Sequence, residues 1–62
     1  SIDVLYLDIN YIILAIDEDM QPGRIGKPHK KAVAVVELPS GRTKETQTQI
    51  GQAVKFIEEG GK

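Results

Sequence analysis

The sequence predicts a small α+β fold, an antiparallel sheet of two or three strands with one C-terminal helix packed on it. The segment 2–17 is rich in the β-branched and aromatic residues that strands prefer. The segment 31–38 is apolar on both faces, and the segment 46–59 repeats apolar residues at helical spacing. Since the chain has only 62 residues, we expect residues 1–62 to form a single domain.

The strand region 2–17 is longer than a typical strand of about 5–6 residues. We therefore expect a break near Asp8, Ile9 and Asn10, where two polar residues interrupt the apolar pattern. The break is either a tight turn between two strands or a bulge in one long strand. A helix is a further alternative, because helical spacing also fits Leu5, Ile9, Ile12, Ile13 and Ile16. The β-branched and aromatic content favours strands.

Residues 18–30 are predicted to form a loop, because Pro22, Gly23, Gly26 and Pro28 lie too close together for a regular element. A second apolar strand follows at 31–38.

The helix is predicted from a capping signal and an apolar stripe. Thr46 and Gln49 have the spacing of a capping box, in which each side chain bonds a free backbone N–H at the helix start. The stripe consists of Ile50, Ala53, Val54 and Ile57. The Gly60–Gly61 pair supplies a left-handed stop. These signals predict a helix over 46–59.

Charge is segregated along the chain although the net charge is only −1. The acidic residues of positions 1–20 are followed by a basic loop at 24–31. Lysine and arginine side chains of this kind can neutralise phosphates without reading sequence. The possible phosphate-binding residues are Arg24, Lys27, Lys30, Lys31, Arg42 and Lys44. A pI near 5.7 and only three aromatic residues argue against nucleic-acid binding as the main function, so it stands as the alternative.

No constellation of catalytic residues is predicted. The chain has no cysteine, and its single histidine, His29, has no nucleophile or orienting carboxylate nearby in sequence. Asp3, Asp8 and Asp17 could converge on Mg²⁺ from neighbouring strands, but strand-end acids are more often solvated surface. We therefore expect no enzymatic activity, no metal and no cofactor.

The apolar segments are too short to cross a membrane. The uncharged apolar run from Ile9 to Ile16 is much shorter than the about 20 residues that a spanning helix needs. We expect a soluble cytoplasmic domain with no membrane partner.

Apolar residues on both faces of the predicted sheet indicate an association surface, because one helix covers one face. We expect a homo-oligomer, a dimer or larger, or a protein partner. The candidate interface residues are Leu5, Leu7, Ile13, Val33 and Val35. The predicted function is a small non-catalytic protein–protein interaction or regulatory module that oligomerises through its sheet.

Residues 11–58 resemble the N-terminal, truncated RNase H-like domain of HicB-type antitoxins. The resemblance is carried by a tyrosine-led strand that ends in acids, an apolar strand ending in Leu-Pro, and a capped helix. The matching positions are Tyr11, Leu38, Pro39, Thr43 and Thr46. Ser40 stands where the family has glycine, and the turn after Asp19 is longer and more basic than usual. The resemblance implies a non-catalytic sheet that binds a small toxin.

Overall fold

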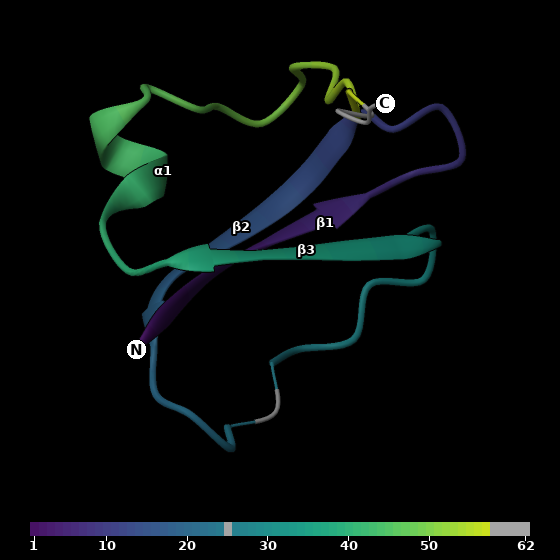
Figure 1. Ribbon diagram of the computed structural model, residues 1–62. Coiled ribbons are helices and arrows are strands. Elements are labelled where there is room, and N and C mark those ends of the chain that lie inside the picture. Colours follow the sequence, from purple (N-terminus) through teal and green to yellow (C-terminus); the bar gives the residue numbers. More distant parts are fainter. Residues whose placement is uncertain (25, 58–62) are drawn as a thin grey trace, which may run out of the picture.

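A computed structural model describes residues 1–24 and 26–57 (Figure 1). It contains three strands, β1 (Ile2–Leu7), β2 (Ile13–Met20) and β3 (Ala34–Pro39), and one short helix, α1 (Arg42–Glu45). The strands form an antiparallel sheet in the order β2-β1-β3, so the first strand of the chain lies at the centre. The predicted small α+β fold is confirmed in this respect. No helix in the described ranges is long and apolar enough to span a membrane.

The break in the first segment is a tight turn between two strands. The Asp8 Oδ1 atom accepts hydrogen bonds from the backbone N–H groups of Asn10 and Ile12, at 2.8 and 2.9 Å. The Tyr11 N–H donates to the Asp8 carbonyl at 2.9 Å, and Tyr11 itself has a left-handed φ of 62°. The predicted break near Asp8–Asn10 is therefore confirmed. The segment forms two strands, and neither the single long bulged strand nor the helix occurs.

β2 continues through acidic residues that were expected to open the loop 18–30. The register moves from Ile2 opposite Met20 to Val4 opposite Asp17, so β2 contains one extra residue at this point, a β-bulge. Asp19 occupies the bulge with a left-handed φ of 57°, and its N–H donates to the Asp3 carboxylate at 2.9 Å. The Asp3 carboxylate thus takes the place of a backbone carbonyl as acceptor for the Asp19 N–H. Because this N–H is satisfied, the pairing of β2 with β1 continues to Met20. β3, expected at 31–38, has its bounds shifted to 34–39.

The helix predicted over 46–59 is wrong throughout its described part. The helical turn α1 (Arg42–Glu45) ends before this segment, and Thr46 caps its C-terminal end instead of opening a helix. Beyond it, Gln47 and Gly51 have left-handed φ values of 56° and 94°, which an α-helix does not accommodate. Residues 58–62, with the remainder of the predicted helix and its Gly60–Gly61 stop, lie outside the described residues.

Backbone hydrogen bonds to β2 and to the turn before it explain why residues 46–57 do not form a helix. The Ile13 N–H donates to the Gln52 carbonyl at 2.9 Å, and the Gly51 N–H donates to the Ile13 carbonyl at 2.8 Å. The Val54 N–H donates to the Tyr11 carbonyl at 2.9 Å. These groups are thereby unavailable for helical bonds. The helical spacing of apolar residues is not used either, because Ile50 and Ile57 are exposed and Val54 packs on the core.

The sheet is covered on both faces by irregular segments (Figure 1). On one face, Leu5, Leu7 and Ile13 form the buried core, against which five half-buried residues pack: Ile16, Ala34, Val36, Leu38 and Val54. On the other face, the long loop between β2 and β3 approaches Tyr6, whose ring lies 4.4 Å from that of His29. Two irregular segments, one on each face of the sheet, therefore take the place of the single helix that the sequence predicted.

Candidate functional site

The five candidate interface residues divide between the core and the surface. Leu5, Leu7 and Ile13 have exposed fractions of 4%, 0% and 1%, because the chain itself covers them. Val33 and Val35 are 61% and 56% exposed. Only these two valines are therefore available for contact with another molecule.

Both exposed valines lie at the edge of the sheet, Val35 within β3 and Val33 directly before it, whereas Lys31 lies in the turn that the bond from the Ala32 N–H to the His29 carbonyl closes. Exposed and half-buried residues alternate strictly from Lys31 to Pro39. The exposed residues before Pro39 are Lys31, Val33, Val35 and Glu37. The Val33 N–H donates to the Leu7 carbonyl at 2.8 Å, although Leu7 is already opposite Ala34, the last pair of the β1–β3 register. We name these four residues the β3 edge surface.

The outer edge of β3 has no backbone partner among residues 1–24 and 26–57. β1 pairs with β3 on one side over its whole length, from Ile2 opposite Pro39 to Leu7 opposite Ala34. No other backbone hydrogen bond of the described residues involves Ala34–Pro39. An open strand edge presents N–H and C=O groups to which another strand can add.

The opposite edge of the sheet is protected. Residues 51–54 cover the start of β2 through the bonds to Ile13 and an isolated bridge between Ile12 and Ala53. The end of β2 carries three consecutive carboxylates, Asp17, Glu18 and Asp19. Charged residues on an edge strand discourage the approach of a second strand. The two edges therefore differ in backbone cover, since residues 51–54 bond to the start of β2 and no described residue bonds to the outer edge of β3.

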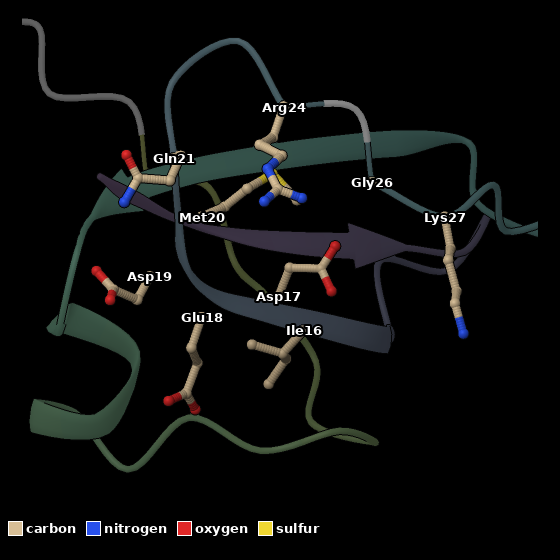
Figure 2. Close-up of a pocket in the computed structure, with 9 residues that line it drawn as sticks. All are labelled: Ile16, Asp17, Glu18, Asp19, Met20, Gln21, Arg24, Gly26 and Lys27. Atoms are coloured by element: carbon tan, nitrogen blue, oxygen red, sulfur yellow. The ribbon is translucent and has the colours of Figure 1, made fainter.

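An open cleft of about 520 Å³ lies beside the acidic end of β2 (Figure 2). Asp17, Glu18 and Asp19 line it along the strand, and Arg24 and Lys27 line it from the loop, with the Asp17 carboxylate on the loop side and the Glu18 side chain pointing away from the loop. Within the described ranges the one ion pair is elsewhere, between Arg42 and Glu45 at 3.2 Å. The same cleft therefore contains acidic residues as well as two of the cations that were expected to bind phosphate.

The six candidate phosphate-binding residues fall into two groups. Arg24 and Lys27 line the cleft, and Lys30 and Lys31 are exposed further along the same loop. The remaining two, Arg42 and Lys44, are on α1, which is attached to the core face through Thr43 and Asp3. The structure does not bring all six to one surface.

A hydrogen bond between Tyr6 and Asp17 lies directly beneath the loop that connects β2 to β3. The Tyr6 hydroxyl donates to Asp17 Oδ2 at 2.7 Å, and this bond, together with partial burial and the carboxylate charge, raises the pKa of Tyr6. Gly26 lies directly over the pair. A Cβ atom at Gly26 would collide with the Tyr6 hydroxyl oxygen and lie 2.8 Å from Asp17 Oδ2 and 3.0 Å from Met20 Cε. Glycine at this position allows the loop to close on the sheet.

Replacing Gly26 by alanine will therefore disturb the Tyr6–Asp17 pair. We expect the free energy of unfolding to fall by about 1–3 kcal/mol, as in other overpacked sites. A pH titration followed by tyrosine absorbance will also show the pKa of Tyr6 moving toward its usual value. In a Tyr6→Phe background, which lacks the colliding oxygen, the loss caused by Gly26→Ala will be smaller. An equal loss in both backgrounds would contradict this account.

Asp3 has a structural role, since its carboxylate joins three segments of the chain. Its Oδ1 atom accepts the Asp19 N–H at 2.9 Å, and its Oδ2 atom accepts the N–H groups of Thr43 and Gly41 at 2.9 and 3.2 Å. These bonds, the Asp19 bond foremost and then the Thr43 bond, lower the pKa of Asp3 from 3.8 to about 2. The side chain is 1% exposed. The sequence analysis did not identify this role. A signal was present, because Asp3, Leu5 and Leu7 are alternate residues of β1 and their side chains therefore lie on the same face of the sheet.

Asp3, Asp8 and Asp17, considered above as a convergent metal site, have separate partners. Asp3 binds backbone N–H groups on the core face, Asp8 organises the β1–β2 turn, and Asp17 accepts the Tyr6 hydroxyl on the other face. No group of three potential metal ligands occurs among residues 1–24 and 26–57. The three carboxylates do not converge.

Comparison with known proteins gives a family match over nearly the whole chain. The model of the family DUF192, described as "Uncharacterized ACR, COG1430", matches residues 1–56. The chain belongs to the DUF192 family. The resemblance to HicB-type antitoxins is therefore wrong, and the residues that carried it have other places in this DUF192 chain: Tyr11 closes the β1–β2 turn and Thr46 ends α1. No curated protein and no solved structure matches the chain.

Proposed function

We propose that this DUF192 chain is a non-catalytic association module that oligomerises through the open edge of β3. The observation that supports the proposal is an outer strand with no backbone partner on one side in the described part of the chain, with one exposed valine, Val35, within it and another, Val33, directly before it. Burial of apolar side chains and completion of backbone hydrogen bonds both favour the addition of a strand there.

The short length of β3 sets the expected strength of the association. Six residues of edge provide a small interface, and interfaces below the standard size are typically weak or transient. We therefore expect a dimer whose population depends on protein concentration, with a dissociation constant of about 10 µM to 1 mM.

The experiment is a measurement of solution mass over a range of concentrations by sedimentation equilibrium. Val35→Lys, which places a charge on the β3 edge surface, will shift the equilibrium to single chains. Ile50→Lys is the matched control, because Ile50 is also exposed, at 63%, but lies in the segment that follows α1. The proposal fails if the native chain has the mass of one copy up to about 1 mM. It also fails if Ile50→Lys disrupts association and Val35→Lys does not.

A further inference from the structure

We infer that a cavity beneath the loop between β2 and β3 binds a small molecule with an apolar body and one anionic group, and that Arg24 binds the anionic group. The cavity has a volume of about 360 Å³, and we name it the loop cavity. This volume is within the range of small-molecule sites, about 300–1,000 Å³. The inference does not rest on association through β3, because the loop cavity lies within one chain.

The floor of the loop cavity is one face of the sheet. Ile2, Val4 and Tyr6 are alternate residues of β1, so their side chains lie on the same face. The β1–β3 register sets Val35 directly opposite Tyr6, and Met20 of β2 lies opposite Ile2. Directly opposite residues of an antiparallel pair share a face. Five largely apolar side chains from all three strands therefore line the cavity.

The loop covers this face without filling the space above it. Val4 is only 5% exposed, although its side chain lies on the face opposite to the core. The loop meets the sheet at Gly26, where the Tyr6 hydroxyl occupies the place of a Cβ atom. The segment 21–33 has no helix or strand among its described residues, and long ordered loops of this kind are usually functional.

A tight turn places Arg24 beside the loop cavity. The Arg24 N–H donates to the Gln21 carbonyl at 3.2 Å, and Gly23 has a left-handed φ of 83°. With Pro22 before this glycine, the turn has the features of type II. Figure 2 shows the Arg24 side chain directed from the loop toward the strands, whereas that of Lys27 extends away from Arg24. Of the two cations that line the cavity, Arg24 is therefore the one placed to meet a ligand.

The charges around the loop cavity favour an anion. Arg24 and Lys27 line it together with one carboxylate, Glu37. The one ion pair among residues 1–24 and 26–57 joins Arg42 to Glu45, so neither lining cation is paired with a described carboxylate. A guanidinium group binds a carboxylate or a phosphate through two parallel hydrogen bonds. An apolar floor with such a group beside it is complementary to an apolar molecule that ends in a carboxylate or a phosphate.

Four small compounds test the chemistry of the ligand: hexanoate, hexyl phosphate, hexanol and acetate. Met20 is the only methionine of the chain, so its methyl signal in an NMR titration reports on binding beside it. We expect both hexyl anions to shift this signal, with dissociation constants of about 1–10 mM for ligands of this size. Hexanol lacks the charge and acetate lacks the chain, so each will bind at least about fivefold more weakly than hexanoate. The tighter of the two hexyl anions identifies the anionic group.

Four variants locate the ligand. Arg24→Gln will weaken both hexyl anions at least about fivefold and will change hexanol binding less than about twofold. Lys30→Gln is the matched control, because Lys30 is an exposed cation of the same loop that does not line the cavity. Glu37→Gln removes the lining carboxylate and will strengthen anion binding about two- to threefold at low salt. Its control is Glu18→Gln, because Glu18 lines the cleft beside the acidic end of β2 and not the loop cavity.

The inference is overturned if none of the compounds shifts the Met20 signal, or if hexanol or acetate binds as tightly as hexanoate. It is also overturned if Lys30→Gln weakens the hexyl anions as much as Arg24→Gln does. If Glu18→Gln strengthens anion binding and Glu37→Gln does not, the ligand lies in the acidic cleft and the assignment to the loop cavity is wrong. Anion binding that depends on the hexyl chain, on Arg24 and on Glu37 supports it.

Discussion

Replacing Asp3 by asparagine will lower the thermal midpoint of unfolding by about 10 °C or more, since charged hydrogen bonds to a buried group are among the strongest in a small domain. The geometry explains why so similar a side chain fails. One Asp3 oxygen accepts the Asp19 N–H, and the other accepts those of Gly41 and Thr43. An asparagine amide has one acceptor, so its NH₂ group must face either one or two N–H donors.

The matched control is Asp8→Asn. Asp8 also accepts two backbone N–H groups, but both bond to the same oxygen, Oδ1, so asparagine can retain both. We expect a much smaller change at Asp8. Equal effects at the two positions would show that loss of charge, and not loss of an acceptor, is what matters.

The same carboxylate predicts acid sensitivity with a defined sign. The pKa of Asp3 is lowered from 3.8 to about 2 in the folded chain, so between these values the unfolded chain binds more protons than the folded chain. The stabilisation is fully present above about pH 4 and is lost as the pH falls through about 2. Denaturant unfolding of the native chain and of Asp3→Asn at several pH values will show their difference shrinking in that window. A constant difference would exclude this origin.

Truncation of Leu7 to alanine will cost about 2–5 kcal/mol, because Leu7 is completely buried at the centre of the core. A chain of this length has a total stability of roughly 3–9 kcal/mol, so the variant will be largely unfolded in mild denaturant. The loss will not depend on protein concentration if Leu7 packs within its own chain. Circular dichroism during urea unfolding at two concentrations measures both quantities.

Ile9→Ala is the comparison for Leu7→Ala. Ile9 is 79% exposed at the tip of the β1–β2 turn, and its truncation will change stability by less than about 0.5 kcal/mol. If instead the loss at Leu7 disappears at high protein concentration, Leu7 contributes to an interface between chains, as the sequence alone had suggested.

The sheet could be predicted from the sequence because its signals are local. The β-branched residues of β1, β2 and β3 alternate with the strand period, and Asp8 with Asn10 marks the turn between the first two strands. Val33 and Val35 could be recognised as surface candidates for the same reason. In β3 the alternation of exposure follows directly from the pleat.

The remainder depended on contacts between distant residues. Ile50, Ala53, Val54 and Ile57 have helical spacing, but backbone bonds to Tyr11 and Ile13 hold that segment against β2. The five interface candidates were expected to be too many for one helix to cover, yet three of them, Leu5, Leu7 and Ile13, form the core on which Val54 of an irregular segment packs. Likewise, nothing near Asp3 in the sequence indicates that Gly41 and Thr43 bring their N–H groups to it.

The central position of β1 has a consequence for the order in which the fold can assemble during synthesis. Of the three strands, β1 is synthesised before β2 and β3 but requires a neighbour on each side, and β3 follows only after the long loop has been made. The Asp3 carboxylate can accept the Thr43 N–H only after that distant part of the chain has been synthesised. Local pairing of β1 with β2 can form early, whereas the completed sheet must close a long loop, a step that slows folding. Until then the edge of β1 that will receive β3 stays open to other strands.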